Sequence, residues 1–157
     1  MKLMLKQRLP SWLDSTDVFD EAGDAVFHVD GQLSLGQQFD IYDSYGCHIA
    51  SLRRRRVSVL PRFEIIIGGV GCGDLCRELS LRRTCYRLDH FGWVIEGNLT
   101  QWDYEISTVS GTPVARVFGE PDGYGLEVVR SRDALAALLV VLAMDVEKSS
   151  RNAQQHH

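Results

Sequence analysis

Residues 134–144 read Ala-Leu-Ala-Ala-Leu-Leu-Val-Val-Leu-Ala-Met, eleven consecutive apolar residues near the end of a 157-residue chain. Because alanine and leucine have high helix propensity, this stretch predicts an α-helix, expected over about residues 133–147. We expect Ser131 to cap its N-terminus, and Asp133 and Lys148 to complement the two ends of the helix dipole. A helix without a polar face must be buried on every side. Eleven residues span only about 16 Å, which is too short for a bilayer but close to the depth of a small β-barrel.

Most of the remaining chain has the pattern of short antiparallel strands. Apolar and polar residues alternate with period two, and glycine-containing turns such as Asp43-Ser44-Tyr45-Gly46 separate the runs. A unit of three residues, large apolar, then charged, then aliphatic, recurs at steps of 18 to 24 residues, about one hairpin apart. Its copies are Phe39-Asp40-Ile41, Phe63-Glu64-Ile65, Tyr86-Arg87-Leu88, Tyr104-Glu105-Ile106 and Leu126-Glu127-Val128. The sequence therefore predicts a mainly β fold, a closed antiparallel barrel of about 10–12 strands around a central hydrophobic C-terminal helix, because closure removes exposed strand edges.

Length and composition fit one globular domain, expected over residues 1–148. With 45% hydrophobic and 24% charged residues, the chain can build a core that needs neither disulfides nor a structural metal. No apolar run reaches the roughly 20 residues that cross a bilayer, and residues 1–10 lack the apolar stretch of a signal peptide, so we expect a cytoplasmic protein. Polar residues 149–157 are expected to form a disordered tail. The closing His156-His157 is compatible with a native end or with residues added for expression.

The net charge of −4 conceals an uneven distribution. Residues 1–52 and 88–157 each sum to −5, whereas residues 53–87 sum to +6, and every basic residue of that segment is arginine. Guanidinium groups donate paired hydrogen bonds that suit phosphate and carboxylate, so the segment indicates an anion-binding surface. The candidate binding residues are Arg53, Arg55, Arg56, Arg62, Arg82 and Arg83. The alternative interpretation is a solvated strand face whose charges only oppose edge-to-edge aggregation.

Alternation along the strand that contains Leu52 predicts the direction of the first arginines. Arg53 and Arg55 are expected to face solvent, because they have the opposite parity to the apolar residues. Arg54 shares the parity of Leu52, and a charge cannot be left unpaired in an apolar lumen. We therefore expect Arg54 and Arg56 at the barrel rim or where the strand ends.

The sequence contains no recognisable catalytic or metal-binding constellation. Cys72-x-x-x-Cys76, followed by Cys85 and His90, lacks the paired short spacings of zinc knuckles, so we expect neither a metal nor another cofactor. The glycine-rich run 68–73 is followed by neither Gly-Lys-Ser/Thr nor a helix, and it indicates a hairpin turn rather than a phosphate loop. No histidine outside the tail pairs with a serine or cysteine in a nucleophile elbow; these histidines are His28, His48 and His90. The protein is therefore not expected to be an enzyme.

Several blocks of the chain resemble one known family. The most specific are Leu60-Pro61-Arg62-Phe63-Glu64-Ile65 and Gly92-Trp93-Val94-Ile95-Glu96-Gly97. Shorter blocks keep the same order: Leu5-Lys6-Gln7-Arg8, Ser11-Trp12, Val18-Phe19-Asp20-Glu21-Ala22-Gly23, Ser34-Leu35-Gly36, Ile41-Tyr42-Asp43 and Asp103-Tyr104-Glu105-Ile106. Over about residues 1–148 the chain is similar to the LURP-one-related family. This resemblance implies the tubby C-terminal-like fold, a β-barrel around a hydrophobic helix that phospholipid scramblases share.

In that wider group, tubby proteins bind phosphoinositide head groups and scramblases are lipid-linked, but no motif lets their lipid-contacting residues be placed on this sequence. Together with the arginine segment, the resemblance predicts a non-enzymatic binding module for anionic phospholipid head groups or another phosphate-bearing ligand, cytoplasmic and peripheral at the membrane. The alternative is a protein-interaction or structural barrel with an unidentified partner. Nucleic acid is a less favoured partner, because no aromatic residues interleave the basic stretch.

Overall fold

The computed structural model describes residues 1–6, 14–32, 37–55, 62–78, 85–88, 91–98, 101–121 and 123–155. Within these ranges, twelve strands form one antiparallel barrel, which closes through the pairing of the first strand with the last. The strands are β1 (Lys2–Leu5), β2 (Ser15–Phe19), β3 (Ala25–Gln32), β4 (Gln38–Asp43), β5 (His48–Arg54), β6 (Arg62–Ile67), β7 (Val70–Glu78), β8 (Cys85–Leu88), β9 (Trp93–Asn98), β10 (Asp103–Thr108), β11 (Pro113–Glu120) and β12 (Gly123–Val128). A 3₁₀ turn, η2 (Ser131–Asp133), leads into the helix α1 (Ala134–Gln155).

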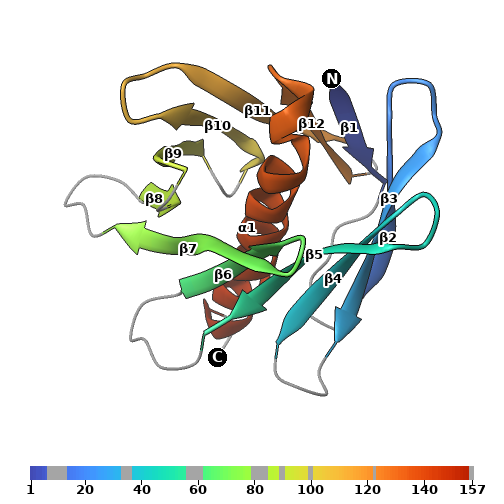
Figure 1. The fold of residues 1–157 in the computed structure, drawn as a ribbon. Coiled ribbons are helices and arrows are strands. Elements are labelled where there is room, and N and C mark those ends of the chain that lie inside the picture. Colours follow the sequence, from blue (N-terminus) through green and yellow to red (C-terminus); the bar gives the residue numbers. More distant parts are fainter. Residues whose placement is uncertain are drawn as a thin grey trace.

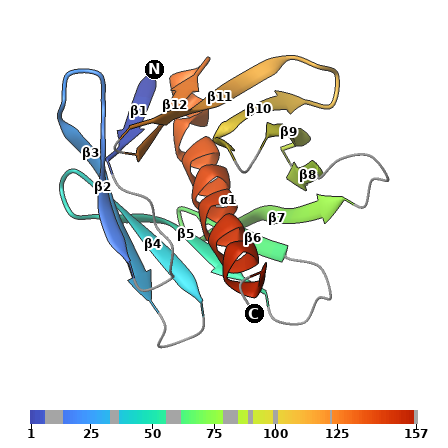
Figure 2. The same ribbon diagram turned by 180° about the vertical axis from the view of Figure 1, so that it is seen from behind.

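The arrangement confirms the predicted barrel around a central helix. Each strand pairs with its neighbours along the chain, so the barrel is a simple up-and-down meander. Figures 1 and 2 show α1 inside the ring of strands from opposite sides. No helix in the described ranges combines the length and the hydropathy needed to cross a bilayer.

The repeated three-residue unit explains how the barrel builds its core. Its five copies lie on β4, β6, β8, β10 and β12, which all run in the same direction. In each copy the two outer members of the triplet are buried and the central charged residue points outward, as in Phe39-Asp40-Ile41. The period-two alternation therefore sends one apolar set from every second strand onto the helix.

The helix is buried as the sequence predicts, but it is longer than expected. Side chains from Ala136 to Glu147 are all buried. The expectation of a disordered tail from residue 149 is wrong in part, because α1 continues to Gln155. The chain contains neither glycine nor proline after Gly125, so nothing in the sequence stops the helix where it leaves the apolar core.

Both helix ends differ from the predicted capping pattern. Ser131 does not cap α1, because it belongs to η2, and the 3₁₀ turn itself carries the backbone into the helix. A 3₁₀ turn satisfies backbone groups at a helix start without a side-chain cap. Lys148 cannot complement the negative end of the dipole, because it lies about two turns before the end of α1 at Gln155.

The two ends of the barrel are built differently. At the end where even-numbered strands finish, short turns follow β2, β4, β6 and β10; we call this the turn end. In two of these turns an aspartate carboxylate accepts two backbone N–H groups: Asp20 from Ala22 and Asp24, and Asp43 from Tyr45 and Cys47. Glycines 23 and 46 supply the positive φ that these turns need, at +85° and +82°.

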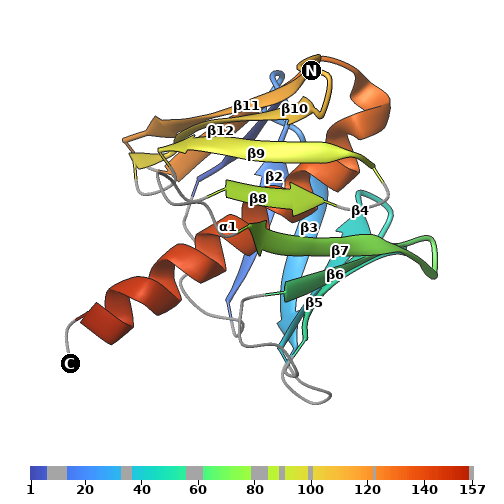
Figure 3. The same cartoon turned by 90° about the vertical axis from the view of Figure 1, so that its left-hand side faces the viewer.

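The opposite end is where the helix leaves the barrel, and we call it the helix-exit end. Asp145 lies here, because it accepts a hydrogen bond from the hydroxyl of Tyr124 near the start of β12. Figure 3 shows α1 continuing beyond the strands on the side where β7 finishes. The odd-numbered strands finish at this end, among them β5 at Arg54 and β7 at Glu78.

Candidate functional site

Three of the candidate arginines, Arg53, Arg55 and Arg62, lie at the helix-exit end. Arg53 is on the outward-facing parity of β5, Arg55 follows that strand directly, and Arg62 is the first residue of β6. The backbone N–H of Arg55 donates to the carbonyl of Arg62 at 2.9 Å, so these two residues are direct cross-strand neighbours. Of the other candidates, Arg56, Arg82 and Arg83 lie outside the described residues.

Two carboxylates lie between these arginines. Arg55 contacts Glu64 through Nη2 at 3.1 Å and Asp74 through Nε at 3.5 Å. Arg62 contacts the same Asp74 through Nη1 at 3.8 Å. The side chains of Arg55 and Arg62 are each 45% exposed, whereas those of Glu64 and Asp74 are 24% and 22% exposed. We call Arg53, Arg55, Arg62, Glu64 and Asp74 the arginine–carboxylate cluster.

The structure agrees with the parity prediction for Arg53, Arg54 and Arg55, whereas Arg56 lies outside the described residues. Arg53 pairs across the strands with Glu64 on the outer face, and its Nε donates to the side-chain oxygen of Gln38 at 3.0 Å. Arg54 pairs with Phe63, whose side chain is fully buried, and it is the last residue of β5. Arg54 is therefore half-buried at the rim, where its charge still reaches solvent.

The cluster has more positive than negative groups but is not an open cationic patch. Three guanidinium groups face two carboxylates, and one carboxylate, Asp74, serves two arginines. Since each exposed ion pair contributes only about 0–1 kcal/mol, an incoming anion can displace a carboxylate from an arginine at small cost. The sequence could not reveal this partial neutralisation, because Asp74 is placed next to Arg62 by the β6–β7 pairing.

The structure also brings together a serine, a histidine and an aspartate that the sequence did not connect. His48 Nε2 lies 2.9 Å from Ser51 Oγ and 3.3 Å from Asp40 Oδ1, and the Ser51 hydroxyl donates to Asp40 at 2.8 Å. Because β5 has an irregularity around Ile49, His48 and Ser51 share the outer face despite their opposite parity.

This group lacks the geometry of a nucleophilic relay. In such a relay the serine and the carboxylate contact different ring nitrogens of the histidine, whereas here both face Nε2. The hydroxyl of Ser51 is already donated to Asp40, and the residue is only 3% exposed. The three side chains therefore fix strands β4 and β5 to each other on the outer face.

The cysteines and glycines singled out in the sequence have structural positions. Cys72 and Cys76 are half-buried on β7, while the side chain of Cys85 and all of His90 lie outside the described residues. Within the described part of the chain, no group of three or more His, Cys, Asp or Glu side chains is arranged to hold a metal ion. Gly68 and Gly69 form the predicted turn between β6 and β7, both with positive φ.

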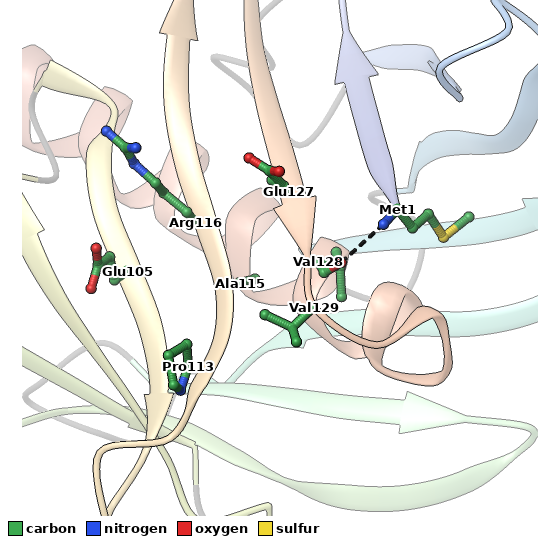
Figure 4. A pocket seen from close by; sticks show the side chains of 8 residues that line it. All are labelled: Met1, Glu105, Pro113, Ala115, Arg116, Glu127, Val128 and Val129. Atoms are coloured by element: carbon green, nitrogen blue, oxygen red, sulfur yellow. Dashed lines mark hydrogen bonds between the residues drawn. The ribbon is translucent and has the colours of Figure 1, made fainter.

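A surface groove of about 410 Å³ crosses the outside of β10, β11 and β12. Figure 4 shows Arg116 between Glu105 and Glu127, which are its direct cross-strand partners. The N-terminal ammonium of Met1 closes one side of the groove by donating to the carbonyl of Val128 at 3.0 Å. Asp103 also lies 3.9 Å from the Arg116 guanidinium, so three carboxylates surround this group. Even with the Met1 ammonium beside it, the groove is less suited to an anion than the arginine–carboxylate cluster.

Comparison with known proteins fits these observations. A family model described as LURP-one-related matches residues 1–145. The chain belongs to this family. A relative from Bacillus subtilis (strain 168), named "Uncharacterized protein YxjI", is 26% identical over 152 residues, which cover 93% of each protein. The X-ray structure of the Arabidopsis thaliana protein AT5G01750 superposes with a TM-score of 0.67 at 17% identity, covering 93% of this chain and 90% of that one.

Membership of the LURP-one-related family confirms the resemblance seen in the sequence, and the Arabidopsis structure confirms the tubby-like fold. Family and fold together suggest a binding-type module, but a fold alone does not specify what is bound. The names of these similar proteins specify no ligand, so the ligand of this chain has to be argued from its own side chains.

Proposed function

We propose that this LURP-one-related barrel is a non-enzymatic binding module for anionic phospholipid head groups or another phosphate-bearing ligand, acting peripherally at a cytoplasmic membrane surface. The proposal rests on one observation above all. Arg55 and Arg62 are cross-strand neighbours on the outer face and share the single carboxylate of Asp74, at 3.5 Å and 3.8 Å. A phosphate group has the charge and the oxygen geometry to bind two such guanidinium groups at once.

The position of the cluster supports a surface-binding role. The cluster lies at the helix-exit end, where β5 and β7 finish, and Arg56, Arg82 and Arg83 follow these two strands in the sequence. The two half-exposed guanidinium groups keep donors that Glu64 and Asp74 do not occupy. Each basic residue close to an anionic bilayer contributes about 1 kcal/mol of binding free energy, so several are needed for measurable affinity.

Vesicle flotation tests the proposal directly. The full chain is mixed with phosphatidylcholine vesicles that contain or lack phosphatidylserine or a phosphoinositide, at low and at high salt. We expect flotation only with the acidic lipids and a loss of flotation as salt rises, because exposed charges are screened. Phosphoinositide vesicles compared with inorganic phosphate as a competitor distinguish a lipid surface from a free phosphate ligand.

Variants of the cluster give effects of opposite sign. The double substitution Arg53→Gln and Arg55→Gln removes two charges and should weaken binding by about 2 kcal/mol, roughly 30-fold. Asp74→Asn removes the competing carboxylate and should strengthen binding roughly fivefold, about 1 kcal/mol. Arg116→Gln is the matched control, because Arg116 is an exposed arginine of another strand, β11. No flotation of the parent protein at low salt, or equal flotation of all variants, would refute the proposal.

A second candidate function, a protein-interaction or structural barrel, is favoured by two other observations. Arg55 and Arg62 are already paired with carboxylates, as expected if they only keep the outer face soluble. In addition, the large apolar side chains that are exposed in the described ranges all lie at the turn end: Met1, Tyr45, Val70, Val109 and Val129. Recovery of one protein partner in equal amounts by the parent chain and by the Arg53/Arg55 variant would favour this candidate.

A further inference from the structure

A separate pocket lies at the turn end, on the side of the barrel away from the arginine–carboxylate cluster. It has a volume of about 340 Å³ and is formed by three chain segments, 91–93, 108–114 and 130–133. The first precedes and begins β9, the second is the β10–β11 turn, and the third joins β12 to α1 through η2. We call this cavity the turn-end pocket. Nothing in the proposed function uses it.

Two arginines of the pocket differ from Arg55 and Arg62 in having no acidic partner among the residues that the structure describes. Arg130 and Arg132 line the pocket, and both are exposed. Among the residues that the structure describes, neither forms an ion pair, whereas Arg55 and Arg62 each contact a carboxylate. Their donors are therefore available to an anion without displacing an internal partner.

The β10–β11 turn supplies a rigid polar wall. The Thr108 and Ser110 hydroxyl oxygens are 2.9 Å apart, and the N–H of Thr112 donates to Thr108 Oγ1 at 3.0 Å. The N–H of Val109 donates to the carbonyl of Gly92 at 3.0 Å, which ties this turn to the segment that carries the aromatic residues. A wall held by these bonds is already ordered before a ligand arrives, so binding costs less conformational entropy.

Another part of the pocket lining is aromatic. The rings of Phe91 and Trp93 both line the pocket, with their centroids 4.9 Å apart and their planes tilted by 43°. Pro113 and Val114 extend this apolar surface. Trp93 is 4% exposed and the half-buried Phe91 packs against the core, so these side chains offer a ligand an apolar edge beside the arginines. The pocket therefore fits a molecule with a flat apolar part next to its anionic group.

We propose that the turn-end pocket binds a small organic anion, in which one phosphate or carboxylate group is attached to a flat apolar group. The anionic group lies between Arg130 and Arg132, and the apolar group contacts Phe91 and Trp93. Asp133 also lines the pocket, so its charged lining sums to +1. This balance favours a ligand with one anionic group over a polyanion.

Chemical-shift titration of the full ¹⁵N-labelled chain tests the proposal with four probes: phenyl phosphate, benzoate, inorganic phosphate and benzyl alcohol. We expect saturable shifts with phenyl phosphate or benzoate, confined to the amides of residues 91–93, 108–114 and 130–134. The comparison of phenyl phosphate with benzoate shows which anionic group the pocket takes. Benzyl alcohol carries no charge and inorganic phosphate has no apolar part, so each should bind about tenfold more weakly or not at all.

Substitutions identify the groups responsible. Arg130→Gln combined with Arg132→Gln should weaken binding at least about tenfold, the loss expected when a charge-assisted hydrogen bond disappears. Arg116→Gln should leave it unchanged, and the spectrum of each variant reports whether the barrel still folds. Absence of localised shifts with both aromatic anions, or shifts that persist in the arginine variant, would overturn the proposal. Equal binding of inorganic phosphate would overturn the assignment of the aromatic wall.

Discussion

Two tyrosines beside one buried carboxylate offer a sharp test of how the helix is held in the barrel. Asp145 of α1 is 1% exposed, and the hydroxyl of fully buried Tyr124 donates to its Oδ2 at 3.3 Å. Tyr104 is also 1% exposed, but its hydroxyl has no hydrogen-bond partner in the described part of the chain. Burial, and then the negative charge of Asp145, raise the pKa of Tyr104 well above its usual value. The hydroxyl groups of Tyr104 and Tyr124 therefore contribute differently to the free energy of unfolding.

The expected effects of removing each hydroxyl can be estimated. Tyr124→Phe removes a donor from a buried carboxylate, and hydrogen bonds to charged groups contribute about 1.5–3 kcal/mol. At 3.3 Å the bond is long, and Asp145 has a further interaction, so the lower value of about 1.5 kcal/mol applies. Tyr104→Phe removes a buried polar group without a partner, so the free energy of unfolding should stay the same or rise by up to about 1 kcal/mol.

Urea unfolding of the parent and the two variants measures this difference. If the m-value, the dependence of the free energy of unfolding on urea, is unchanged, the urea midpoint of Tyr104→Phe should equal or exceed that of the parent, and the midpoint of Tyr124→Phe should be lower. The free energies of unfolding of the two variants should then differ by about 1.5–2.5 kcal/mol. The two substitutions are chemically identical and both sites are buried, so each controls for the other. If Tyr104→Phe were as destabilising as Tyr124→Phe, the Tyr104 hydroxyl would have a stabilising partner and this reasoning would be refuted.

Three further predictions follow from the same core. The pKa of Tyr104 is raised above 10.0 in the folded state, so the contribution of its neutral hydroxyl to the free energy of unfolding is complete below that pH and is lost as the pH rises through the folded-state pKa. Unfolding curves at increasing alkaline pH should therefore show a smaller loss of stability for Tyr104→Phe than for the parent protein. Leu138→Asp places an unpaired charge at a fully buried helix position and should abolish folding, which circular dichroism would detect. Leu138→Ala should lower the free energy of unfolding by about 2–5 kcal/mol, and Leu135→Ala, at a half-buried position, should lower it clearly less. Gly97→Ala would place a Cβ 2.6 Å from the Tyr104 Cα at a φ of +134° and should lower thermal stability by about 1–3 kcal/mol or more, whereas Gly119→Ala, with its nearest neighbour at 3.5 Å, should be tolerated.

The barrel was predictable because two features of the sequence, the repeated triplets and one unbroken apolar stretch, agree with each other. The repeated triplets specify which side of each strand is apolar, and residues 134–144 supply an element that needs to be covered on all sides. The length of α1 was not predictable in the same way, because residues 149–157 are mostly polar, which favours a tail over a continued helix. A helix anchored inside a barrel continues until a residue stops it, and this chain has no glycine or proline there.

The candidate sites were less predictable because they depend on register. The charge sums located the arginines but not Asp74, which meets Arg55 only after the strands pair. The contact of His48 with Ser51 depends on an irregularity that alternation cannot foresee. Arg130 and Arg132 lie in a segment whose overall charge is negative, so a segment sum hides them. Their position just before an apolar helix was the one available signal.

The two candidate sites lie at opposite ends of a rigid barrel, and this has a consequence for how they act. Strands of six residues such as β9 and β10 span about 20 Å, well beyond the distance at which substitutions usually couple. The element between the sites is α1, whose side chains from Ala136 to Glu147 are buried inside the barrel, and such a close-packed core disfavours a second packing that a ligand could select. The effects of Arg53/Arg55 and Arg130/Arg132 substitutions on vesicle flotation and on organic-anion binding should therefore be additive. A measured coupling between them would require α1 to have two positions in the barrel, and amide exchange along Ala136–Glu147 with and without each ligand would then reveal the movement.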